Sequence, residues 1–341
     1  MTSGAARVPT YTGLVEPDAL GLTLMHEHVF VGDLELDRAL PHPAWDEQGA
    51  VDAAVETMHR LHARGVRTLV DLTVPGIGRN AALVARVAAA SPVRIVAATG
   101  WYSVGDLPPA VRMHGPGTLV GGPDPLVEVM LRDLEHGIAG TDVRAGVIKV
   151  ASDIGGITPD VRRVFAAAAH AHRRTGAPIM THSHAASRGG IEQLELLDEL
   201  GVAADRIVVG HAGDSTELDY LLALAARGAY LGFDRFGMEH VLADRDRMRM
   251  LLGVLEHGLA EQVVLSHDAA VFSRVTPPGW RAAHAPNWHM EHLFTSVLPL
   301  LADAGVSTRE IETMLVDVPR TLLAAAPGRV GTPQRDGGLP Q

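Results

Sequence analysis

The chain has 341 residues, of which 47% are hydrophobic and 20% are charged, a balance typical of a soluble globular protein. Its formal net charge of −11 argues against a nucleic acid or an anionic membrane as a partner. The absence of cysteine excludes disulfides and thiolate chemistry, so any metal must be held by His, Asp, Glu or Lys.

The chain begins with residues 1–16, which are small, polar and marked by Pro and Gly, and we expect a tail with a short hairpin there. This beginning lacks an apolar signal core, and no apolar run is long enough to span a bilayer, so we expect a cytoplasmic protein. Residues 327–341 are rich in Gly and Pro and are expected to be disordered. Residues 17–326 between these two segments are predicted to form one domain.

From Leu22 onward one pattern repeats, in which a short apolar run is followed by a loop and an amphipathic helix. Apolar runs without charges are typical of parallel strands covered on both faces. The predicted strands are Leu22–Met25, Thr68–Leu72, Ile95–Ala98, Gly146–Val150, Pro178–Thr181, Arg206–Val209, Ala229–Gly232 and Val263–Leu265. The predicted helices between them are Val51–Ala63, Ala81–Ala90, Asp124–Ile138, Pro159–Arg174, Gly190–Leu200, Thr216–Arg227 and Arg247–Glu256.

This alternation predicts a (β/α)₈ barrel, an α/β fold, because the chain carries eight strand–helix units without a linker. A doubly wound sheet is the alternative, but no Gly-rich phosphate loop follows the first strand. After the eighth strand we expect a helix over Pro286–Ala304. A capping box formed by Ser307 and Glu310 then predicts a last helix that runs through Met314.

Lys149 is the only lysine of the chain, since every other basic side chain among the 29 is arginine. It lies in the apolar run 146–150, a predicted buried strand in which a lone ammonium is costly. A desolvated lysine can lose its proton and act as a nucleophile, whereas an arginine stays charged. A lysine that extends from a strand end into water is the structural alternative.

Other polar side chains follow the predicted strands, and in a barrel the carboxyl ends of the strands meet at one mouth. The groups at these ends are His26 and His28, Lys149, His182, His211 and His267-Asp268. The spacing of the first two places both imidazoles on the same face of a strand. Because these groups exceed what one tetrahedral zinc ion needs, we expect two divalent metal ions.

Two neighbouring cations need an anionic bridge between them. As an ammonium, Lys149 would repel both ions, and as a neutral amine it would bind only one. A carbamate formed from Lys149 and CO₂ would supply two oxygens and a negative charge, and we therefore expect that modification. Zinc is the expected metal, and cobalt, manganese and iron are also compatible with nitrogen and oxygen ligands.

Seven segments of the chain resemble the phosphotriesterase family of the amidohydrolase superfamily, and most closely its phosphotriesterase-like lactonases. They occur in family order and extend from about residue 8 to 325. The segments are GLTLMHEHVF (21–30), ATGWY (98–102), AGVIKVASD (145–153), IMTHSHA (179–185), VVGHAGDS (208–215), GFDRFG (232–237) and LSHDA (265–269).

The resemblance implies a binuclear centre in which a metal-bridging hydroxide attacks the ester and Asp268 takes up a proton. The implied ligands are His26, His28 and Asp268 for the more buried metal, His182 and His211 for the more exposed metal, and carbamylated Lys149 as the bridge. Tyr102 matches a tyrosine that lines the lactone pocket, and Arg235 matches an arginine at the pocket wall.

The activity implied by the resemblance is the opening of lactones, such as N-acyl homoserine lactones or other γ- and δ-lactones, with slower hydrolysis of organophosphate triesters. The alternatives are a dedicated phosphotriesterase, another amidohydrolase such as a one-metal deaminase, and a barrel that binds without catalysis. The resemblance likewise implies a homodimer. It also implies that the ligand of each chain is a small-molecule lactone or organophosphate ester.

The chain departs from the family pattern at Ala269-Ala270-Val271, where relatives often have cysteines, and at residues 152–155, which replace a more acidic segment. Neither segment is expected to touch a ligand, but both are expected to alter the pocket. The remaining candidates are assigned to packing or support: His184, His289, His292, Glu27, Asp71 and Thr99. Trp280, in the predicted loop 269–287, is expected either to close over the substrate or to cover the core.

Overall fold

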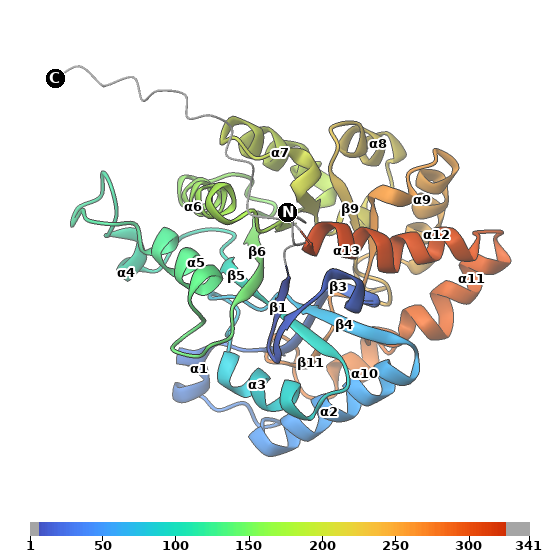
Figure 1. The fold of residues 1–341 in the computed structure, drawn as a ribbon, viewed down its shortest axis with the longest axis horizontal. Helices are drawn as coiled ribbons and strands as arrows, with labels where there is room; N and C mark the ends of the chain where they lie inside the picture. The colour runs from blue at the N-terminus through green and yellow to red at the C-terminus, as the bar shows by residue number, and fades with distance from the viewer. Residues whose placement is uncertain (1–6, 325–341) are drawn as a thin grey trace, which may run out of the picture.

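Parallel strands form the centre of the molecule in the computed structural model, which describes residues 7–324 (Figure 1). The expected disordered segment 327–341 lies outside the described residues, as do the first six residues of the expected tail. Within residues 7–324, no helix combines the length and the apolar character that a membrane crossing requires.

Within the described residues, eight parallel strands pair in chain order and confirm the predicted (β/α)₈ barrel. They are β3 (Leu22–Val31), β4 (Val66–Asp71), β5 (Arg94–Trp101), β6 (Ala145–Ala151), β7 (Ile179–His182), β8 (Ile207–Val209), β9 (Tyr230–Phe233) and β10 (Val263–Leu265). The barrel closes just beyond β10, where the Asp268 amide donates to the His26 carbonyl at 3.0 Å and the His28 amide donates to the Ala269 carbonyl at 2.9 Å. A further strand, β11 (Ala270–Ser273), then continues alongside β3.

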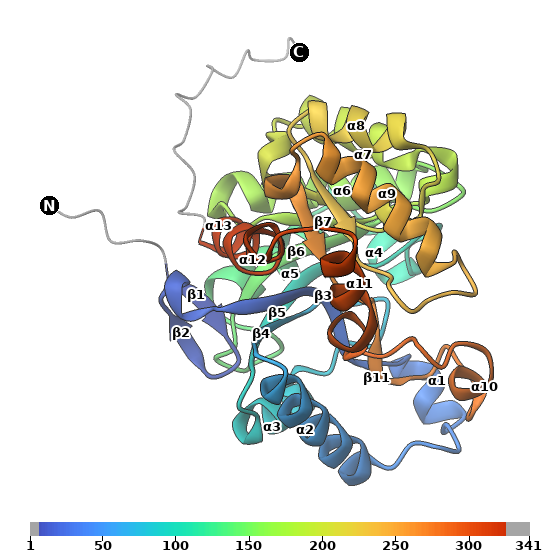
Figure 2. The same ribbon diagram turned by 90° about the vertical axis from the view of Figure 1, so that its right-hand side faces the viewer.

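Helices cover the outside of the barrel (Figures 1 and 2). They are α1 (Leu34–Ala39), α2 (Glu47–Ala63), α3 (Ala81–Ala90), α4 (Pro109–Arg112), α5 (Pro125–Glu135), α6 (Pro159–Thr175), α7 (Gly189–Glu199), α8 (Leu218–Ala226), α9 (Asp244–Glu256), α10 (Trp280–His284), α11 (Leu298–Asp303), α12 (Thr308–Glu312) and α13 (Val318–Leu323). Local chemistry sets several helix ends. The Thr158 side chain caps the start of α6, and the predicted capping box of Ser307 and Glu310 opens α12.

The end of the chain differs from the prediction. The helix expected from Pro286 begins only at Leu293, and the last helix continues past Met314 to Leu323. Each of these helices contains a five-residue π-helical stretch, η6 (Leu293–Val297) or η7 (Thr313–Asp317), and in each a proline comes two residues later. A proline lacks the amide hydrogen and clashes with the preceding turn, so a widened turn lets the helix continue where an ordinary α-helix would break.

The first strand and the loop after the eighth strand also differ from the prediction. The strand predicted over Leu22–Met25 continues to Val31, so His26 and His28 lie within β3 and not after its end. The predicted loop 269–287 contains β11 and α10. The longer β3 and the presence of β11 have one cause, because pairing between β11 and the second half of β3 stabilises each segment as a strand.

An amino-terminal hairpin closes the base of the barrel. Strands β1 (Val8–Thr10) and β2 (Gly13–Val15) pair antiparallel, and Val8 packs with the apolar side chains that fill the barrel interior. These interior side chains include Met25, Val70, Val96, Val147, Met180, Val208 and Val264. Figure 2 shows the hairpin at one end of the barrel and α1 and α10 at the other. The dry interior leaves the buried polar cluster to the carboxyl ends of the strands.

Candidate metal centre

Four imidazoles, one carboxylate and one amine meet at the carboxyl end of the barrel. The contributing residues are His26 and His28 on β3, Lys149 on β6, His182 at the end of β7, His211 after β8 and Asp268 after β10. The structure thus brings together the six residues that the resemblance implied as ligands. His26, His211 and Lys149 are each only 1% exposed.

The inward-facing atoms of this cluster lie close together. The Asp268 Oδ1 atom is 3.1 Å from His28 Nε2 and 3.4 Å from His26 Nε2. The Asp268 Oδ2 atom is 3.8 Å from His211 Nε2, which is itself 2.9 Å from His182 Nδ1. His26, His211 and Asp268 each offer one ligand atom within 4.8 Å of the others, which is a spacing suited to one metal ion.

Asp234, at the end of β9, fixes the orientation of two of the imidazoles. Its carboxylate accepts from His26 Nδ1 at 2.6 Å and from His211 Nδ1 at 3.0 Å. Burial alone would raise the pKa of Asp234, but the two histidines and their hydrogen bonds hold that pKa well below its usual range. Burial lowers the pKa of both histidines, so each is neutral, with its proton on Nδ1 and a lone pair on the inward Nε2.

The other two imidazoles, those of His28 and His182, also turn a lone pair toward the cluster. The Thr73 hydroxyl donates to Asp71 at 2.5 Å, so its oxygen accepts from His28 Nδ1 at 2.8 Å. Asp71 therefore supports the site, as expected from the sequence. His182 directs Nε2 toward the Asp153 carboxylate at 3.6 Å, and burial lowers the pKa of this imidazole to about 4. Its Nδ1 lone pair consequently faces the cluster.

This donor set fits a metal ion. Lone pairs on imidazole nitrogens and an ionised carboxylate face one another at 3.1 to 3.4 Å, an arrangement that is repulsive unless a cation lies between them. Burial would raise the pKa of Asp268, but the Arg235 guanidinium, whose Nε donates to Oδ2 at 3.0 Å, favours the charged form and the pKa lies well below its usual range, so the carboxylate is ionised. Neutral imidazole and carboxylate are ligands that zinc and similar divalent ions accept.

Lys149 is buried beside this cluster. Its Nζ donates to the Thr181 carbonyl at 3.2 Å and lies 3.3 Å from His26 Nε2. Burial lowers the pKa of the amine to about 8, which makes the neutral form far more accessible near neutral pH than in an exposed lysine. Strand β5 approaches closely at Gly100, which has φ of 130°, and a Cβ there would collide with the Lys149 carbonyl.

His211 and Asp268 adopt left-handed backbone conformations, with φ of 62° and 50°. Such values are unfavourable for residues other than glycine and persist only where the surroundings enforce them. The His211 amide donates to Asp234 at 2.9 Å, and the Asp268 amide donates to the His26 carbonyl at 3.0 Å. The same contacts that orient the imidazoles therefore also hold the strained backbone.

Glu27 has the structural role expected from its position between the two histidines. Its buried carboxylate accepts from Ser266 Oγ, from the amides of His267 and Ala269, and from His267 Nδ1 at 2.6 Å. It thereby shapes the turn that carries Asp268. His267, the other member of the predicted pair, is fully buried and receives the Leu293 amide on Nε2, so it contributes nothing to the cluster.

A pocket of about 280 Å³ opens above the cluster, and both predicted pocket residues line it. The Tyr102 hydroxyl lies 3.5 Å from His182 Nδ1, and burial raises the pKa of this phenol to about 12. Arg235 bridges two carboxylates, with Nε donating to Asp268 at 3.0 Å and Nη1 to Asp214 at 3.0 Å. Val31, Ile77, Met238 and Trp288 supply an apolar upper wall.

Two predictions about neighbouring residues were wrong or incomplete. The segment 152–155 was expected to touch no ligand, yet Asp153 faces His182 and Ser152 accepts from Gln193, which also donates to the His182 carbonyl. Trp280 does not line the pocket and instead stacks on His284. Trp288 lines it, with its indole N–H donating to the carbonyls of His267 and Asp268 at 3.1 Å.

The remaining candidates take packing roles. His184 hydrogen-bonds to Ser187, His292 pairs with Asp244 at 2.6 Å, His289 packs against His292, and Thr99 donates to Asp133. The sequence interpretation missed Asp234 and Asp214. Asp234 directly follows β9, so the rule that polar groups at strand ends face the mouth would have included it. Asp214 lies in a short turn after β8 and gives no such signal.

Comparisons with known proteins agree with this geometry. The model of the Phosphotriesterase family matches residues 6–323. The structure of the phosphotriesterase from Mycobacterium tuberculosis is 44% identical, with a TM-score of 0.91 over 93% of this chain and 98% of that one. An aryldialkylphosphatase from Saccharolobus solfataricus is 33% identical over 90% of this chain and 96% of its own length. Another solved structure is 34% identical, with a TM-score of 0.85 over 93% of this chain and 99% of that one. It comes from work that engineered organophosphate hydrolysis activity from a weak promiscuous lactonase template.

Proposed function

The chain belongs to the phosphotriesterase family, and from that premise we propose that it opens lactones, with slower hydrolysis of organophosphate triesters as a second activity. At the level of the family it is a metal-dependent hydrolase, whose buried His/Asp cluster and buried Lys149 fit the metal site. The observation that carries the proposal is the Tyr102 hydroxyl, which stays protonated directly above the metal-binding cluster in a narrow pocket.

We propose two divalent ions, with zinc as the expected metal. His26, His28 and Asp268 would hold the more buried ion, and His182 and His211 the more exposed one. Lys149, as a carbamate, would join them, because its amine is buried and easily deprotonated. When bound, such a pair of ions supplies Lewis acidity and lowers the pKa of a coordinated water.

The side chains around the ions would handle protons and orient the substrate. Asp268 is ionised, and its Oδ2 atom can accept a proton during the reaction. The guanidinium of Arg235 donates to that same atom and limits the directions in which the carboxylate can turn. Tyr102 can donate a hydrogen bond to the oxygen that gains charge as the ester carbonyl is attacked.

The small volume of the pocket supports a lactone over a triester. At about 280 Å³ it lies at the small end of ligand pockets, and a planar ring with one apolar substituent fits it better than a tetrahedral phosphorus with three substituents. Val31, Ile77, Met238 and Trp288 would contact that substituent. The similarity to a structure from the engineering of organophosphate hydrolysis on a weak promiscuous lactonase template supports both activities for a site of this kind.

A dedicated phosphotriesterase is the second candidate, because the aryldialkylphosphatase similarity covers nearly the whole chain. The two functions are separated by kcat/KM values for γ- and δ-lactones and for an aryl dialkyl phosphate, measured on protein reconstituted with zinc or cobalt. The proposal expects the larger value for a lactone, and a larger value for the phosphate triester would favour the second candidate.

Metal content tests the proposed centre separately. Elemental analysis after reconstitution should give about two divalent ions per chain, because the six ligand residues exceed what one tetrahedral ion needs. One ion or none would contradict the binuclear centre. We also propose a homodimer, since twofold dimers are the commonest oligomers, and a monomer mass in light scattering at micromolar concentration would contradict it.

A further inference from the structure

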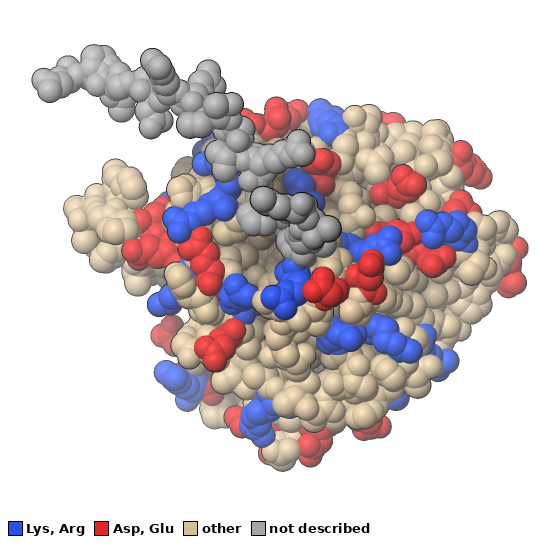
Figure 3. Space-filling model, in the orientation of Figure 1, with Lys and Arg blue, Asp and Glu red and all other residues tan. Residues whose placement is uncertain are grey.

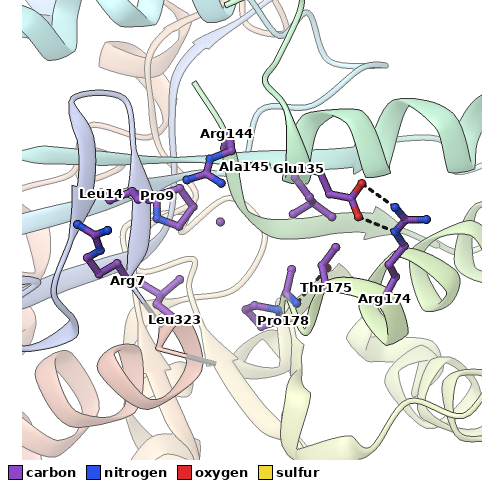
Figure 4. A pocket seen from close by; sticks show the side chains of 13 residues that line it. Arg7, Pro9, Leu14, Glu135, Arg144, Ala145, Arg174, Thr175, Pro178 and Leu323 are labelled. Atoms are coloured by element: carbon purple, nitrogen blue, oxygen red, sulfur yellow. Dashed lines mark hydrogen bonds and ion pairs between the residues drawn. The ribbon is translucent and has the colours of Figure 1, made fainter. Parts of the chain in front are cut away.

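A second cavity lies at the opposite end of the barrel from the metal centre. It encloses about 450 Å³ between the amino-terminal hairpin, the starts of β6 and β7, and the ends of α5, α6 and α13 (Figure 4). A volume of this size is sufficient for a small organic ligand. The buried interior of the barrel separates the two cavities, so this one is independent of the proposed reaction.

Arginine side chains give this cavity a positive lining in a chain of net charge −11. Arg174 is neutralised by Glu135, with Nε and Nη2 at 2.5 and 3.0 Å from the two carboxylate oxygens. Arg7, at the rim, approaches Glu16 only to 3.9 Å and is 56% exposed. Among the residues that the structure describes, Arg144 is half-buried and has neither a hydrogen bond nor an ion pair.

The guanidinium of Arg144 has no partner within the described part of the chain. Figure 4 shows it beside Pro9, on the hairpin side of the cavity, while Arg174 on the far side is turned to Glu135. The donors of Arg144 are in contact with solvent, since none of them is among the buried side-chain atoms that lack a partner. The guanidinium therefore offers a planar pair of donors that suits a single carboxylate.

The remaining lining is largely apolar. Leu14, Leu134, Ala177, Pro178 and Leu323 surround the cavity and can cover a hydrocarbon segment. On the face that bears the hairpin, basic and acidic side chains alternate without a continuous positive surface (Figure 3). Attraction at a distance is consequently weak, and recognition of a charged group would depend on Arg144 at short range.

We propose that this basal cavity binds a small amphiphilic monocarboxylate, with the carboxylate on Arg144 and the hydrocarbon part against the apolar wall of Leu134, Pro178 and Leu323. A phosphate group fits less well, because a dianion would need a second uncommitted arginine inside the cavity, whereas Arg174 is already paired and Arg7 lies exposed at the rim. The ligand is thus defined by one negative charge and a short apolar chain.

The test uses the full chain reconstituted with metal and titrated calorimetrically with hexanoate, with hexanamide as the neutral counterpart. Hexanoate should bind the wild-type protein, and Arg144→Gln should weaken that binding by about tenfold or more, the loss expected for a charge-assisted hydrogen-bonded pair. Arg144→Lys keeps the charge but not the planar fork and should give an intermediate affinity. Activity toward esters should remain unchanged in both variants.

The matched control is Arg162→Gln, which removes an exposed arginine of α6 that pairs with Glu199 outside the cavity. Hexanoate can also reach the metal centre, but that contribution would be the same in all variants. Crystals soaked with 6-bromohexanoate should place the bromine in the basal cavity. The proposal is overturned if Arg144→Gln binds hexanoate as tightly as Arg162→Gln does, or if hexanamide binds as well as hexanoate. A chain truncated after Ala324 is titrated as well, and binding of hexanoate to that chain alone would also overturn the proposal.

Discussion

The two sides of the metal-binding cluster are supported in different ways. On the barrel side, the side chain of Asp234 has no exposed surface and holds His26 and His211 with hydrogen bonds of 2.6 and 3.0 Å. On the pocket side, His182 has a longer contact of 3.6 Å to Asp153, a carboxylate that is 36% exposed. Its other neighbour there, the Tyr102 hydroxyl, is 3.5 Å away.

This difference indicates which side retains the metal and which side selects the substrate. A dry carboxylate interacts strongly with its partners because little water screens it, whereas a carboxylate in contact with water contributes much less. We therefore expect changes on the barrel side to lower metal affinity and changes on the pocket side to alter substrate preference. Lys149 lies between the two sides, and as the proposed bridge it would hold a metal ion on each of them.

The largest effect is expected at Lys149. Lys149→Arg should abolish hydrolysis although it keeps the positive charge, because arginine can neither lose its proton nor form a carbamate with CO₂. Lys149→Ala should also be inactive, but short carboxylic acids such as propionate should partly restore its activity by supplying the missing bridge. Near-wild-type turnover of the arginine variant would exclude the carbamate.

The barrel side is tested by Asp234→Asn. An amide in this position cannot accept from both imidazoles and the His211 backbone amide with the strength of a carboxylate, so the metal affinity should fall by about ten- to a hundredfold. Competition with a chelator, followed by elemental analysis, measures this change.

The control for Asp234→Asn is Asp133→Asn. Asp133 is equally buried but pairs with Arg79 and Thr99 away from the cluster. Both variants should lower the free energy of unfolding of the protein, whereas only Asp234→Asn should weaken metal binding. An equal loss of metal in the two variants would mean that general destabilisation, and not the orientation of the imidazoles, controls the affinity.

The same contrast explains how much could be predicted from the sequence. The barrel could be predicted because its strands are visible as apolar runs, and parallel strands place their ends together. The polar groups near those ends include the six clustered residues, and the resemblance to the family separated these six from His267. The second half of β3 could not be predicted, since its pairing partner β11 is far along the chain and has no clear pattern of its own. Local apolar periodicity does not report such distant pairing.

The supporting residues were harder to predict than the ligands. Asp234 and Asp153 both follow strands, yet nothing in the sequence distinguishes the dry carboxylate from the exposed one. That distinction depends on which loops cover each residue, and loop conformation is set by tertiary packing. Trp288 illustrates the same difficulty, because it lines the pocket while Trp280, on the same connection, does not.

On the pocket side, Tyr102→Phe should lower kcat/KM for lactones by about tenfold, as expected for the loss of one oriented hydrogen bond. The effect on triester hydrolysis should be smaller, because the proposed hydrogen bond of the phenol goes to the carbonyl oxygen of a lactone. Tyr220→Phe is the control, since that hydroxyl accepts from the Gly190 amide far from the pocket. Equal losses for lactones and triesters, or none for either, would remove Tyr102 from the basis of specificity.

The smallest effect is expected for Asp153→Asn. The contact to His182 is longer than a direct hydrogen bond and partly open to water, so its loss should weaken metal binding by only about two- to fivefold, against ten- to a hundredfold for Asp234→Asn. The nearby N–H of His182 is the main cause that lowers the pKa of Asp153 to about 2, so the carboxylate stays ionised at neutral and mildly acidic pH. The difference between variant and wild type should therefore be constant over that range and decrease only as the pH falls toward the lowered pKa, where the wild-type carboxylate becomes protonated. The measurement is the metal affinity of the wild type and of both variants at several pH values. If Asp153→Asn lost as much metal affinity as Asp234→Asn, exposure to water would not separate the two sides of the cluster.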